Sequence, residues 1–431
     1  MAGATYTLAA VNWGLATVGL TLLLLATFSR RLASTPITPA IVVVAIGILA
    51  GPLLLDEFNV GPTSATVRRL AEATLAVMLF ADSSRIDLRA LRREAMLPVR
   101  LLGIGLPLAI GFGTLAALAL FGSLTFSEAL ILGVILAPTD AGLGSAVVTD
   151  ARLPQRLRQT LNVESGLNDG ICVPLLLIVL ASVSGAGGDS QPLHVVVDEI
   201  GYGVLGGVAA GALAGSLVVF GRSRQLIDDA WRQIIPVAAA VLAFGIATAL
   251  GGSGFIAAFL AGVVFGLIVG RGVGRMMRFT EESGAVLDSI TFLVFGAVLL
   301  GPALEHVSWQ IALYAVLSLT IVRMAAVTIA LWGTHVRAPT VAFLGWFGPR
   351  GLASIVFAVI VEDSYPARAG PILTACYVTV GLSVLVHGLS AVPLVTRYAD
   401  WYRSASRRRL PAVESEPAHE HPARGAATAP G

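Results

Sequence analysis

The chain has 431 residues, of which 56% are hydrophobic and only 13% charged, about half the charged fraction of an ordinary soluble protein. Its formal net charge of +2 points to no particular partner, and we expect no nucleic acid among its ligands. Cys172 and Cys376 lie in apolar runs, so neither a disulfide framework nor a metal cluster is indicated. The composition excludes a soluble domain and predicts a protein that crosses the membrane many times.

Apolar stretches separated by short polar connections predict an all-α polytopic membrane protein with about 13 transmembrane helices. The predicted spans cover residues 11–28, 37–55, 67–82, 99–121, 127–148, 160–184, 200–220, 232–250, 253–270, 284–302, 309–332, 340–361 and 369–396. We assign residues 1–400 to one transmembrane domain and residues 401–431 to a short disordered cytoplasmic tail. Residues 87–100 are typical of an amphipathic helix at the cytoplasmic surface, and residues 184–198 of a long external loop.

The arginines fall mainly on one side of the predicted spans. All 28 basic residues are arginine, and 23 of them lie in alternate connections or in the C-terminal tail. The other connections hold only Arg68, Arg69 and Arg368. Because cytoplasmic loops are enriched in basic residues, this distribution supports an odd number of spans. We therefore expect the N-terminus outside the cell and the C-terminus in the cytoplasm.

Charged side chains are predicted at membrane depth, where each costs about 2.5–3.5 kcal/mol on insertion scales. They are Glu72, Asp140, Glu164, Asp169, Arg323 and Arg350. Any one of them could form a structural ion pair, but charges distributed over several spans must share an interior. Because two arginines can pair with at most two of the four acids, the charge balance favours a cationic substrate. We place Asp288, about one turn into the tenth span, at the membrane interface instead.

Proline and glycine interrupt two of the spans. Residues 137–144 read Ala-Pro-Thr-Asp-Ala-Gly-Leu-Gly, and residues 345–351 read Gly-Trp-Phe-Gly-Pro-Arg-Gly. A simple kink is the ordinary interpretation, but each break also contains a charge, Asp140 or Arg350. An acid would offset the exposed amides of a half-helix, and an arginine would offset exposed carbonyl groups. Interrupted helices in matching positions indicate a transport site at the membrane midplane.

Other classes of function have less support in the sequence. A passive channel would need a continuous polar pore or a filter loop, and we find neither. An intramembrane hydrolase would need a nucleophile with a base, or a metal with its ligands. His387, a histidine well inside a span, is interpreted as a packing residue. The stripe of Gly207, Gly211 and Gly215 predicts close helix packing, either within the chain or between two copies.

Several short motifs occur together and in order along the chain. Residues 164–169 read Glu-Ser-Gly-Leu-Asn-Asp, residues 138–140 Pro-Thr-Asp and residues 348–351 Gly-Pro-Arg-Gly. Further motifs are Gly-Gly-Ser-Gly-Phe-Ile-Ala-Ala-Phe at 251–259, Phe-Ala-Asp at 80–82 and Phe-Gly at 295–296. With these motifs the chain resembles the monovalent cation:proton antiporters of the NhaP and sodium/hydrogen exchanger type. The resemblance runs from the first span to about Arg397.

This resemblance implies an NhaA-like antiporter fold of 13 helices in two inverted repeats, with the fifth and twelfth helices crossing while unwound. It implies that Asp169 holds either a cation or a proton. Ser165, Thr139 and Asp140 would supply further oxygen ligands to a transported Na+. Asn168 would belong to the same cation- and proton-binding group, and we expect its carboxamide to hold backbone freed at the breaks.

The resemblance also implies ion pairs that support the site. Arg350 would balance Asp140 where the two breaks cross. Glu164 would form a structural ion pair with Arg323 on the eleventh span. Glu72 on the third span resembles an acid that lines the substrate path in relatives of the NhaP type, and we include it in the cation- and proton-binding group.

One departure from the family pattern bears on stoichiometry. Electrogenic relatives have two adjacent aspartates where this chain has Asn168 and Asp169, and a lysine where it has Arg323. Because arginine does not deprotonate in proteins, no second proton carrier is available. We therefore expect an electroneutral antiporter of the plasma membrane that exchanges one Na+ or Li+ for one H+. K+/H+ exchange on the same fold remains the alternative.

Alternating access would take place at Asp169. The resemblance further suggests a homodimer in the lipid bilayer. We expect no cofactor besides the transported ions.

Overall fold

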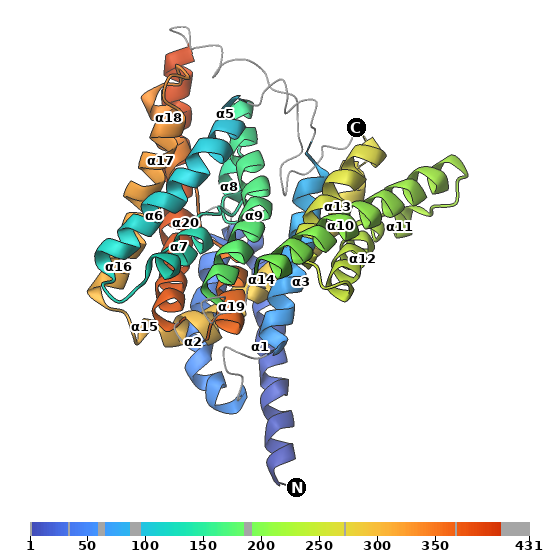
Figure 1. The fold of residues 1–431 in the computed structure, drawn as a ribbon, viewed down its shortest axis with the longest axis horizontal. Coiled ribbons are helices and arrows are strands. Elements are labelled where there is room, and N and C mark those ends of the chain that lie inside the picture. The colour runs from blue at the N-terminus through green and yellow to red at the C-terminus, as the bar shows by residue number, and fades with distance from the viewer. Residues whose placement is uncertain are drawn as a thin grey trace.

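The computed structural model describes residues 2–32, 35–58, 65–86, 96–184, 192–270, 273–366 and 369–406, and over these residues every regular element is a helix (Figure 1). The elements are α1 (Ala2–Leu32), α2 (Pro39–Phe58), α3 (Ala65–Ser84), α5 (Met96–Arg100), η1 (Leu101–Gly105), α6 (Leu106–Leu120), α7 (Phe126–Ile135), α8 (Ser145–Val148), α9 (Gln155–Ser184), α10 (Pro192–Ser223), α11 (Asp229–Arg232), α12 (Ile235–Ala249), α13 (Gly254–Val269), α14 (Val273–Val294), η4 (Phe295–Leu300), α15 (Gly301–Leu304), α16 (Trp309–Leu317), η5 (Ser318–Val322), α17 (Arg323–Ala330), α18 (Ala338–Trp346), α19 (Leu352–Ser364) and α20 (Gly370–Ser406). The elements η1, η4 and η5 are π-helical turns within longer helices.

Within the described residues, helices that continue one another form segments that match the thirteen predicted spans. Seven helices in the described part of the chain are each long and apolar enough to cross a membrane. They are Gly14–Leu32, Met96–Leu120, Gln155–Val183, Val196–Ser223, Met276–Leu304, Trp309–Ala330 and Gly370–Ser404. Shorter apolar helices, such as Ile235–Ala249 and Gly254–Val269, lie between them in the chain. The protein is therefore a multi-pass helical membrane protein, as the composition predicts.

The helices form two packed groups. On one side of the molecule α10, α12 and α13 lie together, and on the other lie α6, α7, α16, α17 and α18 (Figure 1). Helices α3, α9, α14 and α19 lie between these groups (Figure 1). One buried cluster joins α3 to α10, α12 and α13, and a second joins α9 to α17, α18 and α20. Helix α9 thus contacts α10 and α13 of the first group and α7 of the second.

The glycine stripe packs within the chain. A Cβ atom on Gly207 would lie 2.6 Å from the carbonyl oxygen of Ala257, and one on Gly211 would lie 2.5 Å from that of Ala261. Helix α10 therefore approaches α13 backbone to backbone, which only glycine permits at these positions. Of the two interpretations left open by the sequence, packing inside one copy is correct for these residues.

Both predicted breaks are present. Helix α7 begins with a capping box formed by Thr125 and Glu128 and ends at Ile135. Its continuation α8 begins only at Ser145, so residues 136–144 are unwound around Pro138 and form the first break. Helix α18 ends at Trp346 and α19 begins at Leu352. Residues 347–351 lie outside both helices and form the second break. The proline rings and missing amides explain why these apolar segments do not continue as helix.

Two predicted boundaries were wrong. The external loop was expected over residues 184–198, but α10 already begins at Pro192, because proline is favourable in the first turn of a helix and an apolar run follows it. The tenth span was expected to begin near residue 284, but α14 begins at Val273. Asp288 consequently lies well inside this helix rather than one turn from its start.

The helical part of the chain also extends past the boundary at which we predicted a disordered tail. Helix α20 continues to Ser406, past the predicted boundary at residue 401. The ring of Tyr398 contacts Trp401 at a centroid distance of 5.2 Å and Tyr402 at 6.4 Å, so aromatic rings pack against one another along the last turns of the helix. Residues 407–431 lie outside the described residues.

The predicted surface helix over residues 87–100 falls mainly outside the described residues. Its last part, Met96–Arg100, continues directly into η1 and α6. Arg100 donates hydrogen bonds to the carbonyl oxygens of Ala330 at 2.7 Å and Trp332 at 2.8 Å. This arginine therefore caps the end of α17, where helix carbonyl groups lack intrahelical donors.

Candidate functional site

The first break is organised by the carboxylate of Asp140. Its Oδ1 accepts hydrogen bonds from the amides of Gly142 at 2.7 Å and Leu143 at 3.3 Å. Its Oδ2 accepts a hydrogen bond of 2.9 Å from the amide of Leu352, the first residue of α19. The amide of Asp140 donates to the carbonyl oxygen of Pro349 at 2.8 Å. The negative charge of Asp140 therefore offsets the partial positive charge at the N-terminus of α19, which follows the second break.

The second break is organised by Arg350, whose side chain is almost completely buried. Its Nη1 donates hydrogen bonds to the carbonyl oxygens of Ala137 and Pro138, which the first break leaves without helical donors. The expected division of roles, an acid for amides and an arginine for carbonyls, is confirmed. The expected ion pair of Arg350 with Asp140 is not among the ion pairs of the described residues. Each charge instead binds backbone groups of the opposite break.

Glycine permits the close approach of the breaks. A Cβ atom on Gly351 would lie 2.1 Å from Oδ2 of Asp140, and one on Gly348 would lie 2.5 Å from Nε of Arg323. Neither position has room for a larger residue unless the charged side chain of Asp140 or Arg323 moves. The Gly-Pro-Arg-Gly sequence thus fits its surroundings at every position: the glycines admit Asp140 and Arg323, the proline ends the helix, and the arginine binds carbonyl groups.

Helix α9 contacts the first break through Thr139. The hydroxyl of Ser165 donates to the carbonyl oxygen of Thr139 at 2.5 Å. Nδ2 of Asn168 donates to Oγ1 of Thr139 at 2.8 Å. The carboxamide therefore holds a side chain of the break rather than its backbone, which corrects that part of the sequence interpretation. All three residues are buried, with exposed fractions of 4% for Thr139, 5% for Ser165 and 1% for Asn168.

Asp169 follows Asn168 on α9 and lies four residues after Ser165, so it shares a helix face with Ser165. Its Oδ1 atom is buried, whereas the residue as a whole is half-buried. Asp169 is therefore adjacent in α9 to one residue that contacts Thr139 and one turn after another. The structure thus brings Thr139, Ser165 and Asn168 into contact, while Asp169 follows Asn168 in α9 and Asp140 follows Thr139 in the break.

Glu164 and Arg323 form a buried ion pair. Nη1 of Arg323 lies 2.6 Å from Oε1 of Glu164, and each side chain is only 3% exposed. This is the ion pair that the family resemblance implies. It joins α9 to the first residue of α17, on a helix face different from that of Asp169, because the two acids of α9 are five residues apart.

Glu72 makes its contacts elsewhere. Its Oε1 lies 2.7 Å from Nε of Arg68, one turn earlier on α3. Arg68 also forms an ion pair with Asp363, close to the end of α19. Arg68 was expected in a loop, but it lies in the first turn of α3. These contacts place Glu72 in a network at the junction of α3 and α19 and do not bring it to Thr139.

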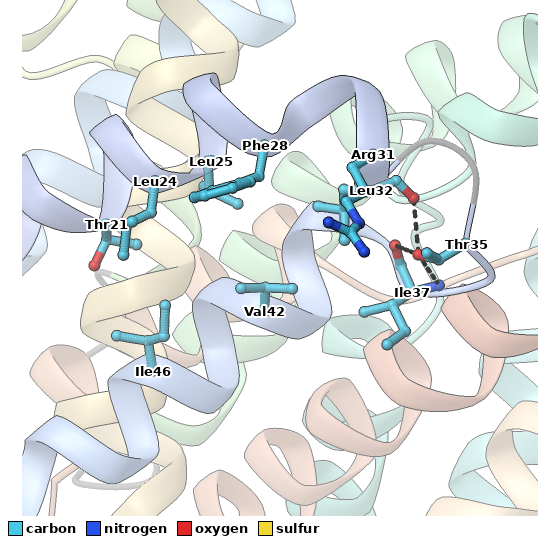
Figure 2. A pocket seen from close by; sticks show the side chains of 10 residues that line it. All are labelled: Thr21, Leu24, Leu25, Phe28, Arg31, Leu32, Thr35, Ile37, Val42 and Ile46. Carbon is cyan, nitrogen blue, oxygen red and sulfur yellow. Dashed lines mark hydrogen bonds between the residues drawn. The ribbon is translucent and has the colours of Figure 1, made fainter.

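A surface pocket of about 430 Å³ lies between α1 and α2 (Figure 2). Its lining is mainly apolar, with Leu24, Phe28 and Val42 among its walls. At one end Oγ1 of Thr35 donates to the carbonyl oxygen of Leu32 at 2.8 Å. None of the residues that line this pocket belongs to the breaks or to α9, so we do not assign it to the candidate site.

The sequence analysis missed the contacts that α20 makes with the second break. The amide of Arg350 donates to Oγ of Ser383 at 2.7 Å, and Nε2 of His387 lies 2.9 Å from the carbonyl oxygen of Trp346. Ser383 and His387 are four residues apart and therefore share one face of α20. That spacing of two polar residues in an apolar span was the available signal.

Comparison with known proteins identifies the class to which this fold and site belong. The profile described as "Sodium/hydrogen exchanger, transmembrane" matches residues 19–397. The chain therefore belongs to the sodium/hydrogen exchanger family, a family of membrane transporters. The resemblance found in the sequence is thereby confirmed.

Individual relatives agree with this family. The chain is 28% identical to the K(+)/H(+) antiporter NhaP of Alkalimonas amylolytica over 398 residues, which cover 89% of this chain and 67% of that protein. It is 25% identical to the K(+)/H(+) antiporter NhaP2 of Shewanella oneidensis over 381 residues, which cover 85% of this chain and 63% of that protein. The chain thus spans about two thirds of the length of these relatives.

The fold is that of a solved antiporter. The sodium proton antiporter MjNhaP1 from Methanocaldococcus jannaschii, solved at pH 8, superimposes with a TM-score of 0.73. The match covers 88% of this chain and 99% of that chain at 19% sequence identity. The antiporter architecture that the resemblance implies is therefore confirmed, and the hydrogen bonds between the two breaks agree with their expected crossing.

Proposed function

We propose that the protein exchanges one monovalent cation for one proton, with Asp169 binding either ion in turn. The observation that supports this role is the position of Asp169 on α9. It directly follows Asn168, which binds Thr139 of the first break, and that break is held by a half-buried acid, Asp140, and by a buried arginine, Arg350. A half-buried carboxylate next to polar groups that face no lipid is the kind of intramembrane acid that binds transported ions.

Hydrogen-bond directions leave oxygen lone pairs available for the ion. The hydroxyl of Ser165 uses its proton on the carbonyl of Thr139, so its own lone pairs stay available. The carbonyl and hydroxyl oxygens of Thr139 each accept one hydrogen bond from α9 and retain a second lone pair. We propose these oxygens and Asp169 as the ligands of the transported ion, since hard cations prefer oxygen.

Asp140 and Asn168 have supporting parts in this proposal. Both oxygens of Asp140 accept amide hydrogen bonds, so this carboxylate acts on the ion mainly through its charge. Asn168 donates through Nδ2, and its buried Oδ1 has no hydrogen bond among the described residues. This amide oxygen is a further candidate to contact the ion. We propose Glu72 as a residue on the ion's path rather than at the central site.

Coupling follows from charge. Asp169 with a proton or a cation bound is closer to neutral than the empty carboxylate, so the loaded site passes the low-dielectric barrier at lower cost. The exchange is electroneutral in this proposal, because Asn168 and Arg323 replace the groups that would carry a second proton. The arginine distribution supports a plasma-membrane protein with its C-terminus in the cytoplasm. Family resemblance favours a homodimer.

Na+ or Li+ is the first candidate for the cation. K+ is a second candidate, and the observation that favours it is that the two bacterial relatives above are K(+)/H(+) antiporters by name. The two candidates differ only in the size and rigidity of the oxygen cage. Proton flux measured separately with sodium, lithium and potassium salts distinguishes them.

The test is fluorescence dequenching of a pH dye in everted vesicles or proteoliposomes. Wild-type protein is expected to release protons when the cation is added, and Asp169→Asn is expected to abolish the signal. Asp400→Asn is the matched control, because Asp400 forms an exposed pair with Arg403 near the C-terminal end of α20. Undiminished exchange by Asp169→Asn would contradict the role of this carboxylate.

A further inference from the structure

A chain of hydrogen bonds from α20 spans the second break. The backbone amide of Arg350 donates to Oγ of Ser383 at 2.7 Å. Oγ of Ser383 lies 3.2 Å from Nδ1 of His387, and Nε2 of the same ring lies 2.9 Å from the carbonyl oxygen of Trp346. Ser383 is fully buried and His387 is 3% exposed. These contacts use neither Asp169 nor the other proposed ligands.

The residues joined by this chain are significant because of their spacing. Trp346 and Arg350 are four residues apart, and in an unbroken α-helix the amide of the second would donate directly to the carbonyl of the first. The break removes that hydrogen bond. Ser383 and His387 are also four residues apart, on one face of α20. Two side chains of one helix thus substitute for one missing backbone hydrogen bond of another.

Nδ1 of His387 also lies 3.0 Å from the carbonyl oxygen of Ser383, so the directions of these hydrogen bonds depend on the tautomer of the ring. Ser383 accepts from the amide of Arg350, so its hydroxyl proton can be donated to Nδ1 of His387. The proton of the neutral imidazole then lies on Nε2 and is donated to the carbonyl of Trp346. A neutral ring protonated on Nδ1 would donate to the carbonyl oxygen of Ser383 and turn its Nε2 lone pair toward that of Trp346, so only the Nε2 tautomer makes both hydrogen bonds across the break. A charged ring would have to be buried without a counter-ion in contact, which is costly.

Arg350 connects these contacts of α20 to the first break. Its amide is fixed by Ser383, while its guanidinium donates to the carbonyl oxygens of Ala137 and Pro138. Those two residues directly precede Thr139. A shift of the Arg350 backbone would therefore move the segment that presents the proposed oxygen ligands.

We propose that Ser383 and His387 are positioning residues, which hold Arg350 and through it the geometry of the ion site. We call these contacts of Ser383 and His387 with the second break the clamp. Its effect on transport rests on the proposed function, but the contacts themselves can be tested separately. His387→Leu removes both ring nitrogens. His387→Gln keeps an acceptor for Ser383 and a donor for Trp346 in one carboxamide. Thr379→Val is the matched control, because Thr379 is equally buried but bonds only within α20, to Ala375 at 2.6 Å.

The first measurement is amide hydrogen exchange of purified protein over residues 344–352. His387→Leu is expected to speed exchange of the Arg350 amide, His387→Gln to restore most of its protection, and Thr379→Val to leave it unchanged. Ser383→Ala, a smaller change, gives the same test if His387→Leu does not fold. Unchanged protection in both variants would overturn the clamp, whether or not the protein transports ions.

The second measurement is the cation dependence of proton exchange in proteoliposomes. His387→Leu is expected to raise the apparent KM for the cation about tenfold, the effect of one lost buried hydrogen bond. The maximal rate should fall much less, and His387→Gln should restore the KM to within about threefold. An unchanged KM in His387→Leu, or a KM raised equally by Gln and Leu, would overturn the positioning role. Absence of exchange in wild-type protein would contradict the proposed function and leave the hydrogen-exchange result to decide the clamp.

Discussion

The buried ion pair of Glu164 and Arg323 allows a prediction whose magnitude can be worked out. Glu164→Ala leaves the guanidinium of Arg323 buried without its counter-ion, and removing one partner of such a pair typically costs about 3–5 kcal/mol. Nε and Nη2 of Arg323 and Oε2 of Glu164 already have no hydrogen bond among the described residues, so we expect a value near 3 kcal/mol. That is about a hundredfold change in the folding equilibrium. Arg323→Ala should have a similar effect.

The assay is thermal or denaturant unfolding of the detergent-purified protein, followed by tryptophan fluorescence. The control is Glu282→Ala, because the pair of Glu282 with Arg278 is 63% and 73% exposed and should contribute less than about 1 kcal/mol. The double variant Glu164→Leu with Arg323→Leu should recover much of the lost stability, since it leaves no unpaired charge. Equal losses for Glu164→Ala and Glu282→Ala would refute the reasoning.

Three further predictions address the breaks and the coupling. Gly351→Ala should lower exchange at least about tenfold in the vesicle assay, since its Cβ would lie 2.1 Å from Oδ2 of Asp140; Gly245→Ala, with open space around it, should not. An imposed membrane potential should leave the exchange rate nearly unchanged, and a steep voltage dependence would exclude one-for-one exchange. Hydrogen bonds from Arg152 lower the pKa of Asp150 below its usual 3.8, so this carboxylate stabilises its turn above that pH and less as the pH falls through the lowered pKa. Asp150→Asn should therefore make the turn easier to cleave by a protease at pH 7. The free energy of local unfolding should fall by less than about 1 kcal/mol, because the ion pair is partly exposed.

Much of the fold could be predicted from the sequence, because a membrane limits the alternatives. Apolar runs of sufficient length must be helices, and prolines such as Pro138 and Pro349 within them must interrupt hydrogen bonding. The same reasoning predicted that Asp140 would offset amides and Arg350 carbonyls. Boundaries outside the apolar core were less predictable, since helices such as α20 continue past their apolar run, with aromatic contacts along the last turns.

The partner of each polar group could not be predicted with equal success. The sequence suggested that Asp140 balances Arg350, but it could not show that both bind backbone of the opposite break, because this depends on the crossing geometry. The contacts of Ser383 and His387 were missed for the same reason. Their spacing was visible, but the missing hydrogen bond they replace lies more than thirty residues earlier in the chain.

The contacts between the breaks also constrain how the protein is made. Asp140 binds Leu352, and Arg350 binds Pro138, across 212 residues of chain. While the first half enters the bilayer during synthesis, the carboxylate of Asp140 and the carbonyl of Pro138 have no partner from the second break, because it has not yet been translated. The nascent fifth segment must therefore stay hydrated, or be shielded by the insertion machinery, until the twelfth segment arrives.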